Sequence, residues 1–258
     1  MVVFAGQGEA ERSMRLLWRA GAPEPRTSPG PKPALSIDDI IRVATDIADS
    51  EGMAALSMRT VGERLGRTAM ALYTYVPSKR ELLDLMYDHL LGELPSTYDA
   101  ALPWREAVTA WATDWRAFYL RHPWVLQISQ ARPVLGPGEF ASTDAAAGVL
   151  ERTGLPADEQ RRVFAIVMHF VRGNASSVVD SRQAALATGV SDEEWWSSRA
   201  SLLDEVAPDF TARFPRAMGL QSGAAFAPGQ TYLEYVEAET ERSFTFGLHA
   251  LLDGIAAS

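Results

Sequence analysis

Two short segments, in which apolar residues recur at helical spacing on either side of a tight glycine-containing turn, constrain the fold of this chain more than any other feature. Ser57 is placed to cap the first segment, and Gly66 can supply the left-handed residue that ends it. Thr68 is placed to cap the second segment, which Pro77 stops. The pattern therefore predicts two short helices joined by a turn of a few residues.

Capping patterns also predict the helices on either side of this pair. Ser36 and Asp39 form a capping box that opens a helix before the pair. Ser78 and Glu81 form another that opens a longer, leucine-rich helix after it. Residues 34–95 are therefore expected to form a small helix-turn-helix domain.

The remainder of the chain reads as helical, without a convincing alternating pattern for a β-strand. Further helices are expected near 104–121, 123–130, 139–153, 157–182, 191–203 and 230–253. The predicted fold class is all-α, with an N-terminal three-helix helix-turn-helix domain and a C-terminal helical bundle over 96–258. Residues 1–33 contain a short possible helix and the run PEPRTSPGPKP, which cannot sustain helix or sheet pairing, so they are interpreted as a flexible arm.

The distribution of charge decides whether the short helices can bind nucleic acid. The net charge of −9 by itself argues against an attraction to phosphates. The acid excess, however, lies mostly outside residues 57–80, which hold one acid, Glu63. The basic residues of this stretch are Arg59, Arg64, Arg67, Lys79 and Arg80. Because the second helix of a helix-turn-helix enters the major groove, this local positive charge indicates DNA binding.

The periodicity of the second helix predicts which side chains face DNA. With Leu72 at the centre of the buried face, Met70, Ala71, Thr74 and Tyr75 turn outward as candidate base readers. Tyr73 and Lys79 flank the helix where phosphates would pass, and Arg59 could reach either a guanine edge or a phosphate. The full set of candidate DNA-binding residues is Arg59, Arg67, Thr68, Ala69, Met70, Ala71, Tyr73, Thr74, Tyr75 and Lys79. The alternative is that these helices only pack a small domain.

The run GMAALSMRTVGERLGRTAMALYTYVPSKRELLDLM resembles the DNA-binding domain of the tetracycline-repressor (TetR) family. Four later segments, HPWVLQISQARPVLG, HFVRGNASSVVD, GVSDEEWW and FTFGLHALLDGI, resemble the C-terminal domain of the subgroup that contains the tetracycline repressor itself. The similarity covers roughly residues 34–255. It implies a homodimeric repressor that binds a palindromic operator and is released by a small-molecule effector. Dimerisation would use the two helices that hold Val163, Ile166, Phe170 and Val171, and Tyr235, Phe244, Leu248 and Leu252.

The resemblance also implies an effector pocket in the C-terminal domain, where aromatic residues are concentrated. The candidate pocket residues are Trp111, Trp115, Phe118, Ile128, Phe164, Val167, Met168 and Ser177. Ile128 and Ser177 stand where tetracycline-responsive members have a histidine and a glutamate that help to hold a magnesium–tetracycline complex. The effector is therefore expected to be a different hydrophobic or aromatic molecule. A plain aromatic core explains the same residues comparably well.

Several classes of function lack the residues that they need. The chain has no cysteine, GxGxxG motif, P-loop or recognisable Ser/His/acid set, so no enzyme activity or cofactor is expected. His122, His169 and His249 are isolated from one another and are interpreted as structural, so no metal site is expected. No apolar run approaches membrane-spanning length, and the start does not read as a secretory signal, so a cytoplasmic protein is expected. A constitutive or architectural DNA-binding protein without an effector remains the alternative.

Overall fold

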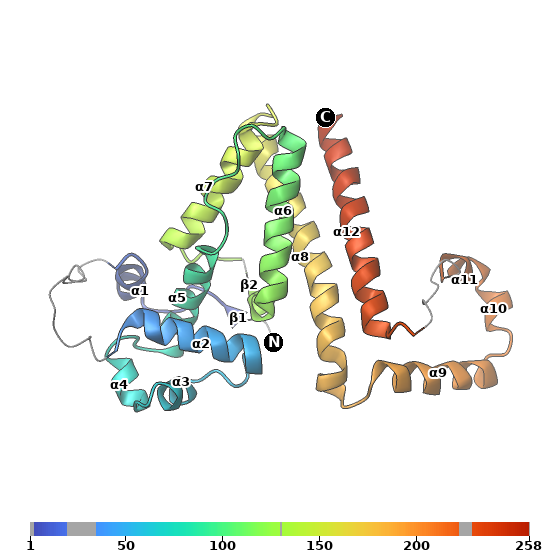
Figure 1. Ribbon diagram of the computed structural model, residues 1–258, viewed down its shortest axis with the longest axis horizontal. Coiled ribbons are helices and arrows are strands. Elements are labelled where there is room, and N and C mark those ends of the chain that lie inside the picture. The colour runs from blue at the N-terminus through green and yellow to red at the C-terminus, as the bar shows by residue number, and fades with distance from the viewer. Residues whose placement is uncertain (1–2, 20–34, 130, 222–228, 258) are drawn as a thin grey trace. The chain divides into compact units, whose positions relative to one another are not determined.

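The computed structural model describes residues 3–19, 35–129, 131–221 and 229–257, and these residues form twelve α-helices (Figure 1). This confirms the all-α fold class. The α-helices are α1 Ala10–Leu17, α2 Ile37–Glu51, α3 Met58–Arg64, α4 Ala69–Tyr73, α5 Lys79–Leu91, α6 Trp104–Arg121, α7 Pro137–Glu151, α8 Ala157–Thr188, α9 Asp192–Val206, α10 Phe210–Arg213, α11 Pro215–Gln221 and α12 Tyr232–Ala256.

Two compact units divide the chain, Met1–Arg172 and Gly173–Ser258. The division falls within α8, not at the expected boundary between residues 95 and 96. The first unit contains both the helix-turn-helix segment and the helices that follow it as far as α7, because α5 packs against α1, α2 and α7. The separation of a DNA-binding domain over 34–95 from the rest of the chain therefore stays a proposal.

The helix starts follow the capping residues of the sequence. Ser36 and Asp39 form the full capping box expected for α2. Ser57 and Thr68 accept hydrogen bonds from amides in the first turns of α3 and α4. The second capping box is incomplete: Ser78 caps α5 by accepting from the Arg80 amide, while its hydroxyl donates to the carboxylate of Glu81.

The N-terminal segment is ordered in part and packs on the first unit. Residues Val3–Phe4 form strand β1, which pairs in parallel with strand β2, Ile128–Ser129. α1 packs against α5, and the amide of Gly6 donates to the Asp84 carboxylate at 2.9 Å. The short helix expected in this segment is present as α1, whereas its packing against α5 was not expected. Residues 20–34, which include the proline-rich run, lie outside the described residues.

The helix expected over 123–130 is wrong beyond its first turn. A 3₁₀-helix, η1 Pro123–Gln127, leads directly into β2. The guanidinium of Arg172 explains the change, because it donates to the carbonyls of Leu126 and Ile128. These carbonyls are therefore drawn to a side chain, and the chain continues as strand β2. Strands of two residues, such as β1 and β2, are too short to show an alternating pattern in the sequence.

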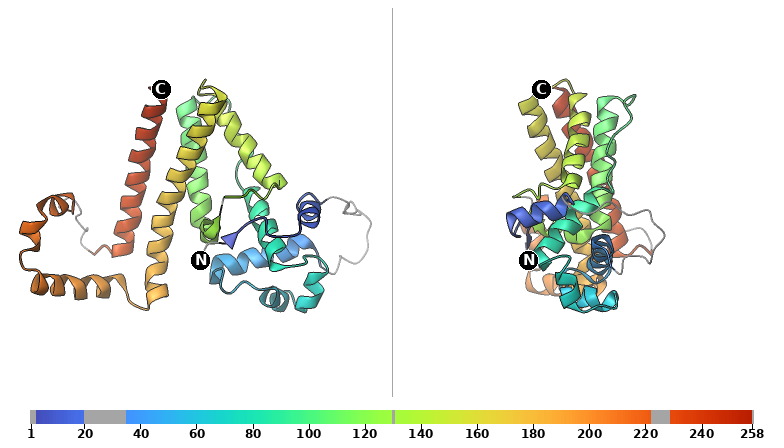
Figure 2. Two further views of the ribbon diagram at one scale, coloured as in Figure 1. Left: turned by 180° about the vertical axis from the view of Figure 1, so that it is seen from behind. Right: turned by 90° about the vertical axis from the view of Figure 1, so that its left-hand side faces the viewer.

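The second unit contains the C-terminal half of α8, with α12 alongside it (Figure 2). The Asn174 side-chain amide donates to the Thr240 carbonyl at 2.9 Å, and Arg182 pairs with Glu237 at 2.7 Å. α9 contacts α12, where the rings of Trp196 and Tyr232 lie 5.6 Å apart.

Candidate DNA-binding surface and effector cavity

A very close approach fixes the turn between α3 and α4. The amide of Arg67 donates to the carbonyl of Gly62 at 2.8 Å, and Gly66 takes the left-handed conformation with φ +64°. A Cβ atom at Gly62 would lie 2.8 Å from the Arg67 carbonyl oxygen, which is closer than real contacts allow. Leu72 and Val76 are fully buried beneath the second helix. These constraints hold α3 and α4 as a rigid helix-turn-helix.

Two of the four candidate base readers are exposed, Met70 on α4 and Thr74 at its C-terminal cap. Met70 is 73% exposed and Tyr73 is 41% exposed, and Thr74 is also exposed. Ala71 and Tyr75 are half-buried, so they present less of their surface to a partner. Of the remaining candidates on this helix and its cap, Thr68 is exposed and Ala69 is half-buried.

The candidate cations differ in how they are held. Arg59 is exposed and pairs with Glu63 one turn later at 2.8 Å, and Arg67 is exposed on the turn. Lys79 is half-buried, and its Nζ donates to the Leu56 carbonyl at 2.5 Å. Burial lowers the pKa of Lys79. Lys79 therefore stabilises the loop before α3 in this structure, and its contact with phosphate stays a prediction.

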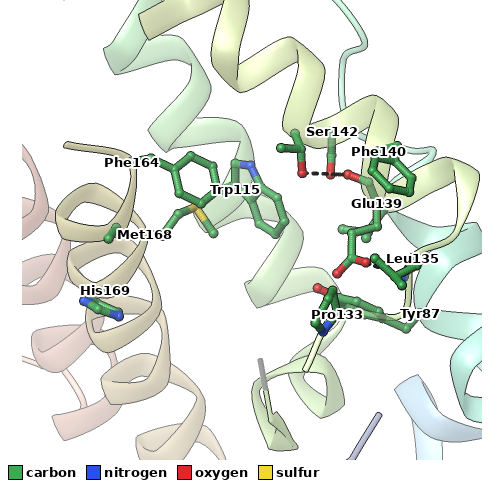
Figure 3. A pocket seen from close by; sticks show the side chains of 13 residues that line it. Tyr87, Trp115, Pro133, Leu135, Glu139, Phe140, Ser142, Phe164, Met168 and His169 are labelled. Carbon is green, nitrogen blue, oxygen red and sulfur yellow. Dashed lines mark hydrogen bonds between the residues drawn. The ribbon is translucent and has the colours of Figure 1, made fainter. Parts of the chain in front are cut away.

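A cavity of about 380 Å³ lies among α5, α6, α7 and α8 of the first unit (Figure 3). Three predicted pocket residues line it: Trp115 from α6, and Phe164 and Met168 from α8. The other lining residues were not predicted: Tyr87, Leu91, Pro133, Leu135, Glu139, Phe140, Ser142, Thr143, Ala165 and His169. They come from separate segments, and no local pattern in the sequence joins them.

The other predicted pocket residues lie elsewhere. Trp111, Phe118, Ile128 and Val167 are buried in the first unit but do not line this cavity. Trp111 packs against the lining residue Phe164, and the centroids of their rings are 5.6 Å apart. Ser177 belongs to the second unit, where it is exposed and its hydroxyl donates to the Gly173 carbonyl.

Carboxyl groups gather at one side of the cavity. Glu139 lines it and accepts a hydrogen bond from the Leu135 amide at 2.7 Å. Asp88 accepts from the amide of Glu139 at 2.9 Å. Burial raises the pKa of both side chains, and the Asp88 charge adds to the shift of Glu139. Burial, with smaller contributions from Glu81 and Glu139, raises the pKa of Asp84 to about 6.

A second buried cluster joins the helix-turn-helix side of the unit to α6. His122 follows α6, and its Nδ1 lies 2.9 Å from the Asp49 carboxylate of α2 while its Nε2 lies 3.1 Å from Glu93. Burial opposes the charged imidazolium, but the hydrogen bonds to Asp49 and Glu93 outweigh it and raise the pKa of His122. The indole of Trp124 also donates to Asp49, at 2.8 Å. His122 is therefore held at both ring nitrogens as a structural link.

Neither a metal centre nor a membrane span is found in the part of the chain that the structure describes. No group of three or more His, Asp or Glu side chains there is arranged to hold a metal ion. No described helix combines the length and the apolar character that crossing a bilayer requires.

Two family models match the chain. Residues 40–86 match the bacterial regulatory proteins of the tetR family, and residues 99–258 match the tetracyclin repressor-like C-terminal domain. The HTH-type transcriptional repressor DrrR1 of Streptomyces coeruleorubidus is 37% identical over 254 residues, which cover 97% of this chain and 87% of that protein. The chain belongs to the TetR family. It is therefore a helix-turn-helix DNA-binding regulator of transcription, as its sequence predicted.

Solved structures of TetR-family proteins share the fold. ActR of Streptomyces coelicolor in complex with actinorhodin is 25% identical, with a TM-score of 0.65, and the match covers 86% of this chain and 97% of ActR. A possible TetR family transcriptional regulator from Streptomyces coelicolor A3(2) matches with a TM-score of 0.62 and 24% identity. The match covers 86% of this chain and 99% of that chain. Both agree with the all-α architecture seen here.

Proposed function

We propose that this TetR-family regulator is a homodimeric repressor that binds a palindromic operator through α3 and α4. A small hydrophobic or aromatic effector, other than magnesium–tetracycline, releases it by occupying the cavity. The observation that carries this proposal is the position of α5. This helix begins at Lys79, directly after the helix-turn-helix, and lines the cavity with Tyr87 and Leu91 near its other end.

α5 is suited to couple the two sites because it is packed on nearly all sides. Ten of its thirteen residues, from Glu81 to Leu91 with the exception of His89, are buried. It contacts α2, which precedes the helix-turn-helix, as well as α7, which also lines the cavity. A closely packed helix moves as one body, so a ligand that favours one position of Leu91 and Tyr87 also favours one position of the DNA-reading helices.

Relatives support both halves of the proposal. The name of DrrR1 describes it as a repressor, and ActR has been solved with actinorhodin, a small molecule. The cavity here has a volume and an aromatic lining typical of sites for small organic ligands.

The dimer is proposed from the family architecture and from exposed apolar residues on the two expected helices. Ile166 of α8 is 50% exposed and Phe246 of α12 is 79% exposed. Five of the eight residues expected at the interface are buried within the single chain: Val163, Val171, Phe244, Leu248 and Leu252. A two-fold dimer would place its recognition helices about 34 Å apart, or a multiple of this distance, in successive major grooves.

Selection of bound sequences from random duplex DNA at defined salt, followed by footprinting, tests the DNA half of the proposal. An enriched palindrome with half-sites about one helical turn apart is expected. The operator then serves as the probe in a screen for small molecules that release the protein. Absence of any enriched sequence would refute the operator, and a specific complex that no cavity-binding compound disturbs would favour a constitutive DNA-binding protein.

A further inference from the structure

Four aromatic rings contribute to the walls of the cavity. Tyr87, Trp115, Phe140 and Phe164 all line it, and its volume of about 380 Å³ is sufficient for a fused ring system. A second hollow of about 360 Å³, which Arg161 also lines, shares Thr143 and Phe164 with it. Figure 3 shows Phe164, Met168 and His169 on one side of Trp115, and Tyr87, Pro133 and Glu139 on the other.

Glu139 is the single acid among the residues that line the cavity, and none of these residues is a lysine or an arginine. The donors to its carboxylate are neutral backbone amides, those of Leu135 and Val134. A carboxylate offers about four acceptor positions, so two amides leave capacity for a donor from a ligand.

The groups behind Glu139 add negative charge. Asp88 and Asp84 are buried, and they accept hydrogen bonds from the backbone amides of Glu139 and Gly6. Arg19 and His89 partly offset the charge of Asp88. Within residues 3–19, 35–129, 131–221 and 229–257, however, none of the three carboxylates forms an ion pair with lysine or arginine. Burying carboxylates without a paired cation costs free energy, and the resulting field favours a cation in the cavity and disfavours an anion.

We propose that the effector is a planar aromatic molecule carrying a positive charge, with its rings among Trp115, Tyr87 and Phe140 and its cationic donor at the Glu139 carboxylate. This inference rests on the proposed function of the cavity as the effector site. Aromatic faces attract cations in addition to stacking on rings, so both parts of the lining favour the same class of molecule. Entry of the ligand supplies the counter-charge that these carboxylates lack.

Glu139 also has a structural role, since its carboxylate accepts from the amides of the loop before α7. A glutamine at this position keeps an oxygen for those amides and removes only the charge. Glu139→Gln therefore separates ligand recognition from loop structure. Asp144→Asn is the matched control, because Asp144 is exposed on the same helix and does not line the cavity.

The test measures binding of three tricyclic probes to the full-length protein without DNA: proflavine, which is cationic, acridone, which is neutral, and acridine-9-carboxylate, which is anionic. The wild-type protein is expected to bind proflavine, to bind acridone more weakly and to exclude the carboxylate. Glu139→Gln should weaken proflavine binding by about 10- to 100-fold, the range for hydrogen bonds to charged groups. It should leave acridone binding unchanged, and Asp144→Asn should behave as wild type.

Three outcomes overturn the proposal, and they differ in what they imply for the cavity. Equal binding of acridone and proflavine to the wild-type protein, which needs no variant, would show that the cavity does not select a cation, while leaving it as an aromatic effector site. Unchanged proflavine binding by a folded Glu139→Gln protein would have the same meaning. Binding of none of the three probes would overturn both the ligand class and the effector role of this cavity, whereas operator selection would still decide DNA binding independently.

Discussion

Replacing Gly62 by alanine tests whether the close approach of α3 to the turn before α4 holds the DNA-reading helix in place. The added Cβ would lie 2.8 Å from the Arg67 carbonyl oxygen and 3.2 Å from the Ala69 amide nitrogen. Both are backbone atoms, which cannot swing away as the end of a long side chain can. The turn and the start of α4 must therefore move.

Two opposing contributions set the size of the effect. Overpacking of a tight contact costs about 1–3 kcal/mol, and the higher helix propensity of alanine returns up to about 1 kcal/mol. We expect a net loss of up to about 2 kcal/mol relative to wild type, and each kcal/mol lowers Tm by about 2–4 °C for a chain of this size. Operator affinity should fall as well, because α4 no longer sits at its original distance from α3.

Thermal unfolding followed by circular dichroism, with operator binding measured by fluorescence anisotropy, supplies both readouts. Gly148→Ala is the matched control, since Gly148 lies in α7 with open space around its added Cβ, and it should stabilise the protein slightly. A Gly62→Ala protein as stable as the Gly148→Ala protein, with undiminished operator affinity, would refute the reasoning.

Three further predictions follow from the DNA-binding surface and the buried ionisable groups. Tyr73→Ala should weaken binding to all DNA sequences comparably, whereas Thr74→Ala should change the sequence preference. Selection of bound sequences with both variants tests this. A changed preference for Tyr73→Ala together with an unchanged preference for Thr74→Ala would contradict the assignment. The pKa of His122 is raised above its unfolded-state value of 6.5, so the stability that its charged form contributes is fully present below pH 6.5 and is lost as the pH rises through the folded-state pKa. His122→Asn should therefore flatten the dependence of Tm on pH above 6.5. Superimposable curves of Tm against pH for the variant and the wild type would contradict this. The pKa of Asp84 rises from 3.8 to about 6, so the folded state loses up to about 3 kcal/mol between these pH values. Asp84→Asn should therefore unfold at a higher temperature than wild type at pH 7 but not at pH 4, and the idea fails if the variant gains nothing at pH 7.

The helix-turn-helix could be predicted from the sequence because its determinants are local. Ser57, Thr68 and Gly66 act within one or two turns of their own positions, and the structure places each in the expected role. The position of the Lys79 side chain could not be predicted from the local sequence. Its contact with the Leu56 carbonyl joins residues 23 apart in sequence, and no periodicity signals that contact.

The cavity was only partly predictable because its walls are assembled from distant segments. Trp115, Phe164 and Met168 were expected from aromatic content and family resemblance, and all three line it. Glu139 was not, since its place in the cavity depends on a loop that folds back toward α5. The packing of the N-terminal segment was missed for the same reason: the Gly6 amide is held by Asp84 of α5, and the two residues of β1 are too few to show a pattern.

The burial of α5 has a consequence for how ligand specificity can change in proteins of this lineage. Tyr87 and Leu91 face the cavity from a helix whose other sides pack against α1, α2 and α7, so a substitution there is expected to alter folding together with ligand choice. Phe140, Thr143 and His169 line the same cavity from exposed positions on α7 and α8. Adaptation to a new effector is therefore expected to begin with substitutions at those three positions, while the residues of α5 stay unchanged.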